Sequence, residues 1–552
     1  MKRFAWLIAI ACVLLLNVAA HFCVIRRDLT DDRRYSLSPA TVQLLDSLHT
    51  PLHVTLYLNG DLNPSFTRLR NATEEMLEEL HARNSDIRWN VLSEDELTAL
   101  AEQQDIVFQP IVVHEREKNG TTVRHTVYPY ALVQCNGRNA LVNLLQNNRG
   151  RSGEENMNAS IENLEYAFSE TIHRVQQTDI PRIAFNEGHG ELPEQNVYDL
   201  SLALSKYFQI DRGSIGSDAQ ALDPYRAIII ADPQGAFSEA DKYVIDRYVQ
   251  QGGNILWVVN GVQFSQDVLA ESGFTPVLPL DLNLSDMFFR YGVRVNPALV
   301  QDMQCLPIPV NVSSDPQQPN LQPMPWQYAP LLLTSQGSAI TRNLGQVSSM
   351  FVSPIDLVGD ESLRKDILLA TSTASRLIPT PAEVDLADMD PDRETFRYRY
   401  IPVAVALEGV FPSVFAHRMM PDGIDPATAS KPATPQVSRQ VVVASGSIIR
   451  NEVQQGQALP AGYDRYSGMQ FSNRDFLVNA VLYLTDAQGL ISLRQKSVAL
   501  RLLNDRRAHD ARTNIQLIST LVPICLLALI GLIVNLIKRN LYAVPYARRQ
   551  QP

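Results

Sequence analysis

RAIIIADPQGAFSEADKYVIDRYVQQGGNILWVVNG, residues 226–261, contains two short apolar runs on either side of a helical pattern. The runs at 227–231 and 254–259 do not alternate with polar residues, which is typical of strands buried on both faces of a parallel sheet. Between them, Ser238 can cap a helix and Gly252-Gly253 can end it. The stretch therefore predicts a strand, a helix and a second, parallel strand.

Further apolar runs extend this predicted sheet in both directions along the chain. RIAF at 182–185 precedes it, and VAVAL at 403–407 and QVVVASG at 440–446 follow it. Prolines interrupt the pattern in three stretches, which we interpret as loops or insertions because proline cannot donate to a strand ladder; these are 303–325, 378–391 and 411–435. We expect residues 180–505 to form one large, mostly parallel α/β domain.

A smaller α/β domain is predicted at residues 28–157. Ser38-Pro39 can start a helix, and a strand pattern, a charged amphipathic segment and a second strand pattern follow before a hairpin around Asn119-Gly120. This order suits a thioredoxin-like fold, although no Cys-x-x-Cys supports redox chemistry. A connecting helix is predicted at 158–179.

Both ends of the chain are apolar over membrane-spanning lengths. The run at 4–25 predicts an N-terminal anchor within residues 1–27, and the run at 515–537 predicts a second transmembrane helix at 512–538. A cleaved signal peptide is the alternative for the first run. The basic tail at 539–552 has no acid and favours a cytoplasmic C-terminus. We therefore expect a multi-pass protein of the cytoplasmic (inner) membrane with its large domain extracytoplasmic.

Charge and cysteine content exclude several classes of function. A formal net charge of −11 and a pI near 5.5 argue against a nucleic-acid partner, which would require a basic face. Cys135 and Cys305 are the two cysteines outside the apolar ends, so one disulfide has room to form and a zinc cluster does not. We expect no metal and no cofactor.

The sequence also lacks the parts of an ATPase or a serine hydrolase. No Gly-Lys pair occurs, so a phosphate-binding loop is absent and any transport would need a separate ATPase. The turn after the run at 227–231 reads Asp232-Pro233-Gln234-Gly235, with no nucleophile. Ser445 and Ser447 flank Gly446 in another turn, where we expect hydroxyls satisfied within the turn.

The candidate site is FNEGHGEL at 185–192, where Glu187 and Glu191 flank His189. A loop at the carboxyl end of a parallel strand is where α/β folds place ligands, so these residues form a candidate recognition loop. Metal binding by the three side chains is a second interpretation. In the third, which is structural, the glycines permit a sharp turn, His189 bonds across the loop and Glu191 starts the next helix.

Several stretches resemble the GldG family, the membrane-anchored auxiliary subunits of gliding-motility-associated ABC transporters. They occur in the order of the family and span nearly the whole chain: DLTDDRRYSLSPATVQLL (28–45), RIAFNEGHGEL (182–192), YVQQGGNILWVVNG (248–261), LSDMFFRYGVRVNPALVQDMQC (284–305), PWQYAPLL (325–332), ITRNLGQV (340–347) and NRDFLVNAVLYL (473–484).

This resemblance implies a non-catalytic, substrate-binding-type subunit that works beside an ABC permease and a separate ATPase, with an unsettled substrate. It also implies a large domain similar to one in an intraflagellar transport protein, with a glutamine-amidotransferase-like fold. The chain departs from the family at Ser445 and Ser447, where acidic residues are expected.

The residues leave two alternatives to a transporter subunit. The first is a membrane-anchored α/β hydrolase or amidohydrolase that uses Glu187 and His189. The second is a sugar-binding or polymer-binding sensor that uses exposed tryptophans, although Trp257 is expected in the core.

Overall fold

The computed structural model describes most of the chain between the two apolar ends, together with the second of them. The described residues are 36–93, 96, 110–116, 122–146, 152–177, 179–311, 320–359, 362–386, 392–429, 435–486, 490–495 and 511–542. The predicted first span at 4–25 lies outside them. The chain divides into two compact units, Met1–Ser497 and Val498–Pro552.

The first sheet of the larger unit has four strands in the order β2-β1-β5-β6. β1 and β2 are parallel, whereas β5 is antiparallel to both β1 and β6. The strands are β1 (Leu52–Leu56), β2 (Ile87–Val91), β5 (Tyr130–Cys135) and β6 (Arg138–Asn143). The expected hairpin is present as β3 (Ile111–Arg116) and β4 (Thr122–Val127), which pair antiparallel. The thioredoxin-like assignment stays a prediction.

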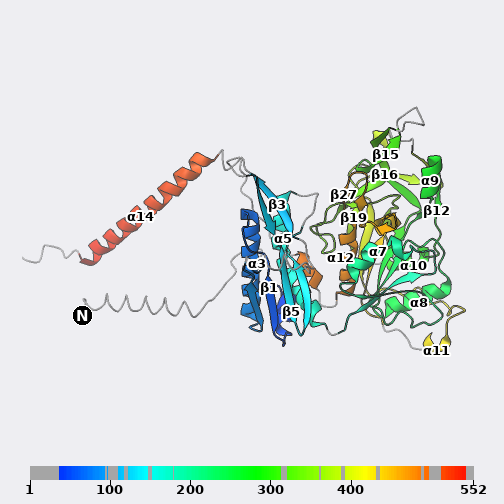
Figure 1. Cartoon of the computed structure of the whole chain (residues 1–552), viewed down its shortest axis with the longest axis horizontal. Coiled ribbons are helices and arrows are strands. Elements are labelled where there is room, and N and C mark those ends of the chain that lie inside the picture. Colours follow the sequence, from blue (N-terminus) through cyan, green and yellow to red (C-terminus); the bar gives the residue numbers. More distant parts are fainter. Residues whose placement is uncertain are drawn as a thin grey trace, which may run out of the picture. The chain divides into compact units, whose positions relative to one another are not determined.

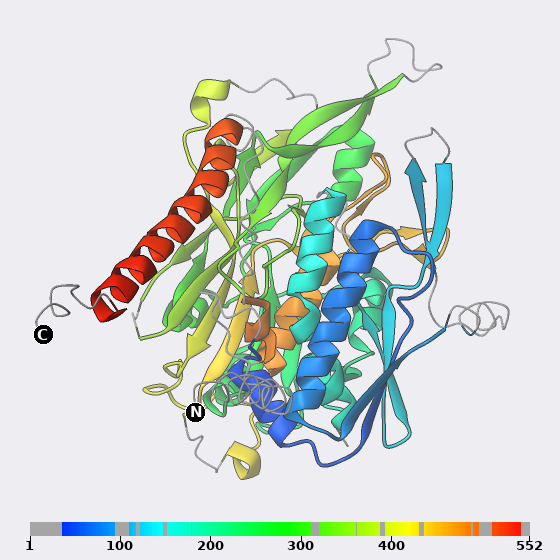
Figure 2. The same cartoon turned by 90° about the vertical axis from the view of Figure 1, so that its left-hand side faces the viewer.

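Four helices pack with this sheet around one apolar core. They are α2 (Pro39–Asp46), α3 (Pro64–Arg83), α5 (Gly153–Glu162) and α6 (Leu164–Gln176), and α3 and α5 lie side by side (Figure 2). Ser38 caps α2 and Pro39 starts it, as predicted. The connecting helix is longer than predicted and has two parts, because a capping box of Ser152 and Glu155 starts α5 early and Asn163 separates α5 from α6.

The second sheet of this unit is mixed, so the prediction of a mostly parallel sheet is wrong. Its order is β15-β16-β19-β22-β23-β10-β9-β7-β8, with β17 (Val347–Ser348) beside β16. The parallel part is β7 (Arg182–Glu187), β8 (Gln209–Ser214), β9 (Ala227–Ala231), β10 (Asn254–Val258) and β23 (Ser438–Val443). The antiparallel part is β22 (Pro402–Gly409), β19 (Arg364–Ala370), β16 (Leu321–Thr334) and β15 (Cys305–Asn311).

Helices cover both faces of the parallel part, which explains its continuous apolar runs (Figure 1). α7 (Tyr198–Leu204) and α12 (Asn473–Thr485) pack on one face, and α8 (Glu239–Gln250) and α10 (Ser285–Tyr291) pack on the other. All five residues of β9 are buried, and Trp257 of β10 is 0% exposed, as expected for a core residue. The predicted capping of α8 by Ser238 is confirmed.

The first proline-rich stretch forms a strand hairpin, so of the two predictions for it, a loop or an insertion, the loop is wrong. Pro307 of β15 lies opposite Pro325 of β16, and Pro309 lies opposite Pro323. Prolines are tolerated here because the hairpin includes the edge strand of the sheet, where fewer backbone N–H groups need a partner. Other small strands also fall in or beside the predicted insertions, among them β20 (Ser375–Pro379) and β21 (Ala382–Asp385).

The two candidate cysteines are both free thiols. Cys135 is buried in β5, with its sulfur 3.3 Å from Oγ1 of Thr50. Cys305 begins β15 and contacts the carbonyl of Met303 through its sulfur. The two cysteines therefore lie in different sheets, and the disulfide for which the sequence left room is not formed.

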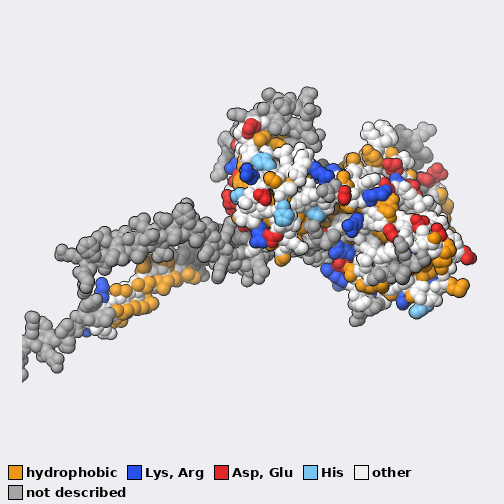
Figure 3. All heavy atoms as spheres, turned by 90° about the horizontal axis from the view of Figure 1, so that it is seen from below, with side chains coloured by type: hydrophobic (Ala, Val, Ile, Leu, Met, Phe, Trp, Pro, Cys, Tyr) orange, Lys and Arg blue, Asp and Glu red, His pale blue; other side chains and the backbone are white. Residues whose placement is uncertain are grey.

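The second unit contains one long helix, α14 (Arg512–Tyr542). Its residues Gln516–Asn540 are long and apolar enough to cross a membrane, in agreement with the run predicted at 515–537. Hydrophobic side chains are exposed along this helix (Figure 3). Pro523 lies inside the helix, which membrane helices tolerate.

Candidate functional site

The loop after β7 lies at the point where the strand order of the sheet reverses. β8 follows β7 on one side of it, and β9, the next strand along the chain, pairs with its other side. A crevice at such a point is the usual ligand site of an open α/β sheet. The candidate residues are therefore in the position that the sequence predicted for a recognition loop.

Hydrogen bonds between the loops after β7 and β9 close this point of the sheet. The amides of Gln234 and Gly235 both donate to the carbonyl of His189, at 2.8 and 2.7 Å. The loop turns at Gly188 and Gly190, whose φ angles are +115° and +73°. These positive angles favour glycine, which confirms the predicted sharp turn. The backbones of the two loops are thus held in direct contact at this edge of the sheet.

The His189 side chain is held between two carboxylates. Its Nδ1 lies 3.3 Å from Oε1 of Glu191, and its Nε2 lies 3.3 Å from Oδ2 of Asp241. The imidazole stacks on Phe237, with ring centroids 3.7 Å apart. Burial alone would lower the pKa of His189, but the hydrogen bonds to Asp241 and Glu191 outweigh it and raise the pKa from 6.5 to about 9. At neutral pH the ring is a cation with both nitrogens bonded, so it cannot accept a proton as a general base.

The two glutamates of the motif have different environments. Glu191 has a side chain that is 2% exposed, and it accepts from Nδ2 of Asn186 at 2.5 Å and from the amide of His189 at 2.7 Å. Glu187 is about half exposed and accepts from Nε of Arg212 at 2.7 Å. The structure therefore brings His189 and Glu191 together and pairs Glu187 elsewhere.

One part of the structural interpretation of this motif is wrong. The sequence predicts that Glu191 starts the next helix, yet α7 starts only at Tyr198, after a short 3₁₀ turn at Glu194–Asn196. The carboxylate of Glu191 instead turns back toward His189 because the buried imidazolium offers it a charged donor. Asp241, the second partner of His189, was not predicted. The sequence does place Asp241 three residues after Ser238, where it completes the capping box at the start of α8.

A second buried carboxylate lies at the end of β9. Asp232 has a left-handed φ of +57°, accepts from Nδ2 of Asn260 at 2.6 Å and from Nε2 of Gln234 at 3.0 Å, and lies 3.5 Å from Nη2 of Arg450. Burial raises its pKa from 3.8 to about 6, and Arg450 offsets part of the rise. A Cβ on Gly446 would fall 2.1 Å from Cγ of Asp232, so the carboxylate occupies the space beside this glycine.

The two serines of the turn after β23 are hydrogen-bonded to each other and to Met350 of a distant segment, so the prediction of hydroxyls satisfied within the turn is right only in part. Their hydroxyl oxygens lie 2.8 Å apart, and both donate to the carbonyl of Met350, Ser445 at 2.9 Å and Ser447 at 3.2 Å. Ser447 also accepts from the amide of Met350 at 2.8 Å. Neither serine has a histidine as a hydrogen-bond partner among the described residues, so this turn lacks the base that a serine nucleophile needs.

The arrangement at this edge of the sheet is therefore a set of side chains paired with one another. In the described part of the chain, no group of three or more histidine, cysteine, aspartate or glutamate side chains is arranged to hold a metal ion. The cluster of His189, Glu191 and Asp241 joins the loop after β7 to the start of α8. Because these side chains bond to one another, the cluster fits a role in holding two segments together better than a role in reversible ligand binding.

A family model described as an ABC-type uncharacterized transport system matches residues 180–480, more than half of the chain. The chain belongs to this family of ABC transport auxiliary components. Membership confirms the resemblance drawn from the sequence at the level of an auxiliary component. The ABC auxiliary family implies a permease and an ATPase as partners in general terms. A second family model, described as a domain of unknown function, matches residues 31–134.

Comparisons with single proteins add little to the ABC auxiliary assignment. The solved "mmIFT52 N-terminal domain" is 15% identical with a TM-score of 0.32, covering 55% of this chain and 97% of its own. A putative ThuA-like protein from Parabacteroides merdae ATCC 43184 is 13% identical with a TM-score of 0.28, covering 56% and 91%. Neither likeness bears on fold or function, because both TM-scores are below 0.5. A search of curated proteins found no match.

Proposed function

We propose that this chain is a non-catalytic, membrane-anchored auxiliary subunit of an ABC transporter of the gliding-motility-associated type. The observation that carries the proposal is the family match over residues 180–480, which supports an ABC-associated auxiliary role. In this proposal the large domain is extracytoplasmic and contacts the permease, and a separate ATPase supplies the energy. The absence of a Gly-Lys pair from the sequence supports the need for that ATPase.

The candidate site supports a role in binding or structure over one in catalysis. The His189 imidazolium has a carboxylate on each nitrogen, and Glu187 is paired with Arg212. The hydrolase alternative needs a neutral histidine beside a nucleophile or water, and the raised pKa of His189 opposes that state at neutral pH. We therefore assign Glu187, His189 and Glu191 to a loop that shapes the edge of the sheet.

Membrane anchoring in this proposal uses both apolar ends of the chain. The span Gln516–Asn540 supports the C-terminal anchor. The run at 4–25 would supply the second, giving a multi-pass protein of the inner membrane with both termini on one side. Lys538, Arg539, Arg548 and Arg549 favour a cytoplasmic position for those termini.

Co-purification tests the proposal directly. The full-length chain, tagged at its C-terminus, is extracted from its own membranes in a mild detergent, and the recovered proteins are identified by mass spectrometry. We expect an ABC permease and an ATPase in near-stoichiometric amounts, and neither with an unrelated inner-membrane protein that carries the same tag. Recovery of the chain alone, under conditions that keep another ABC transporter of the same cells intact, would contradict the proposal.

A further inference from the structure

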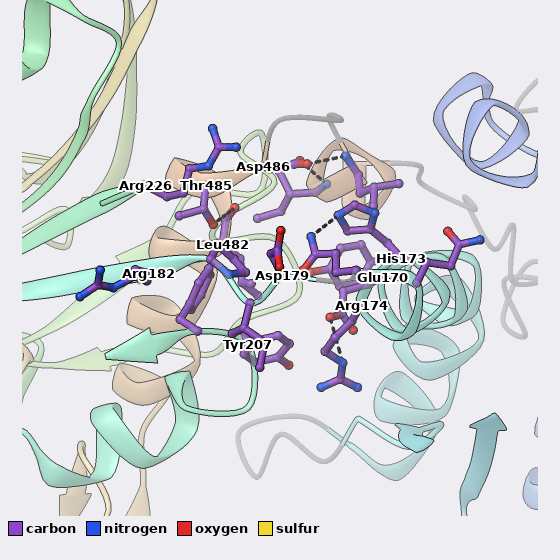
Figure 4. Close-up of a pocket in the computed structure, with 18 of the residues that line it drawn as sticks. Glu170, His173, Arg174, Asp179, Arg182, Tyr207, Arg226, Leu482, Thr485 and Asp486 are labelled. Carbon is purple, nitrogen blue, oxygen red and sulfur yellow. Dashed lines mark hydrogen bonds and ion pairs between the residues drawn. The ribbon is translucent and has the colours of Figure 1, made fainter. Parts of the chain in front are cut away.

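Two neighbouring hollows of the larger unit form a groove between α6 and α12. Their volumes are about 660 and 720 Å³, and both are lined by Tyr166, Glu170, Tyr207 and Leu482. In the first hollow, His173 of α6 lies on the side of Asp486 at the end of α12, whereas Arg174 points toward Tyr207 (Figure 4). Each hollow has the size of a small-molecule site, so the α6–α12 groove has room for a ligand of several linked rings.

Aromatic side chains line the whole length of the groove. Tyr166 and Tyr207 belong to both hollows, Phe208 lines the first, and Tyr463 and Phe471 line the second. The guanidinium of Arg174 lies 5.1 Å from the centre of the Tyr207 ring and helps to fix that ring. Such rings offer flat apolar surface together with a polar edge, which suits a ligand with both kinds of surface.

Amide side chains are concentrated in the second hollow. They are Asn143, Gln146, Asn163, Asn343, Gln470 and Asn479. Asn479 is 6% exposed and donates from Nδ2 to the carbonyl of Ile340 at 2.9 Å, while its Oδ1 has no partner among the described residues. The side chains of Gln146 and Asn163 likewise have no partner in the described part of the chain. These open amide groups line the second hollow, where they can bond to water or to a ligand.

Four arginines and four acidic side chains line the groove, so positive and negative groups are equal in number: Arg174, Arg182, Arg226, Arg474, Glu170, Asp179, Asp475 and Asp486. Glu170 and Arg174 pair at 3.7 Å within the groove. Arg182 pairs with Asp211 at 2.6 Å and Arg474 with Asp199 at 3.5 Å, and these two aspartates lie outside the lining. Asp179 and Arg226, which also line the first hollow, carry opposite charges. The groove therefore has no strong preference for an anion or a cation. Its open hydrogen-bonding capacity comes from amides, which both donate and accept.

We propose that the α6–α12 groove binds a neutral oligosaccharide. Sugar hydroxyls donate and accept in the same way as the amides of the groove, and the flat C–H faces of sugar rings can pack on its tyrosines. This binding site is separate from the loop after β7, and its existence does not depend on the transporter assignment. The exposed tryptophans considered from the sequence play no part, because no tryptophan lines either hollow in the described part of the chain.

The experiment is calorimetric titration of the full-length protein with maltohexaose, cellohexaose and chitohexaose. The detergent must lack a sugar headgroup, since a maltoside would compete for the groove. We expect at least one hexasaccharide to bind. Gln146→Ala should weaken that binding about tenfold through the lost hydrogen bonds, and Tyr207→Ala should weaken it by about tenfold or more through lost stacking.

Two substitutions outside the groove serve as matched controls. Gln209→Ala changes an exposed glutamine at the start of β8, and Tyr198→Ala changes a tyrosine of α7 that is 49% exposed. Both should leave the affinity unchanged. Failure of all three sugars to bind would overturn the proposal, as would an equal loss in the control variants. If Tyr207→Ala does not fold, Gln146→Ala decides alone. Sugar binding without recovery of a permease would contradict the transporter proposal and leave this one intact.

Discussion

His189 shows how one buried side chain can acquire a fixed charge. Phe237 covers one face of the ring and removes water, which disfavours the imidazolium. Asp241 and Glu191 each accept a hydrogen bond from it, and together they outweigh that cost. Because the two carboxylates come from different segments, the charged ring ties the loop after β7 to α8. A residue that resembled a catalytic histidine in the sequence thus acts as a cross-link.

We expect the contribution of His189 to stability to depend on pH in a defined direction. Its pKa is about 9 in the folded chain, compared with 6.5 for an unperturbed histidine. The contribution is therefore complete below pH 6.5 and is lost as the pH rises through 9. Since the side chain is 10% exposed, we expect about 2 kcal/mol from this shift after allowance for solvent.

Urea unfolding at about pH 6 and about pH 10, followed by intrinsic fluorescence, measures this effect. His189→Gln should lower the free energy of unfolding at the lower pH and have a smaller effect at the higher pH. His53→Gln, at an exposed histidine of β1, is the matched control and should change neither value by more than about 0.5 kcal/mol. An equal loss in His189→Gln at both pH values would show that the charge of the ring is not what stabilises the loop.

At the scale of elements, the ends of β9 and β23 meet at Asp232 and Gly446. A Cβ at position 446 would lie 2.1 to 2.4 Å from the carboxyl atoms of Asp232. We expect Gly446→Ala to displace that carboxylate from Asn260 and to destabilise the protein by about 2–4 kcal/mol. The same urea measurement detects the change.

A second substitution separates this contact from a general effect of alanine. Asp232→Gly removes the carboxylate, and glycine accommodates the φ of +57° at that position. The double variant with Asp232→Gly and Gly446→Ala should therefore be more stable than the single variant Gly446→Ala. Gly213→Ala, in a strand where the added Cβ meets nothing within 4 Å, is the control. No recovery in the double variant would mean that the clash with Asp232 is not the cause.

Local patterns in the sequence predicted many of these elements but not how the strands pair. Ser38 and Ser238 cap their helices as expected, because a cap depends on residues within one turn. Whether VAVAL joins the sheet parallel or antiparallel depends on long connections, and the sequence does not encode that direction locally. The prolines of β15 and β16 predict a break in any strand, and only their place beside the sheet edge makes them acceptable.

At the candidate site, the sequence predicted the glycine turn around His189 but did not predict Asp241 as a hydrogen-bond partner of that histidine. The glycines around His189 identified a turn at the end of a strand, and both have positive φ angles. Asp241 lies 52 positions further along the chain from His189, so no local pattern could assign it as the partner. The α6–α12 groove was missed for the same reason, because its two sides lie on helices of residues 164–176 and 473–485.

For the whole molecule, part of the lining of the proposed binding groove comes from residues that lie close in sequence to the proposed C-terminal anchor. Leu490 and Ile491 line its first hollow, and their amides donate to the carboxylate of Asp486 at 3.0 and 2.7 Å. These residues come shortly before the second unit in the sequence. A ligand in the groove would therefore contact Leu490–Gln495, the last described segment of the first unit.

The predicted orientation across the membrane can be tested with cysteine labelling. In a chain with its five native cysteines replaced, Tyr466→Cys places a thiol at a side chain of the large domain that is 55% exposed, and Ala547→Cys places one in the basic tail. We expect a membrane-impermeant maleimide to label the first variant in intact spheroplasts and the second only after lysis, because cytoplasmic flanks retain basic residues. The reverse pattern would place the large domain in the cytoplasm, where it could meet the ATPase but not an extracytoplasmic ligand.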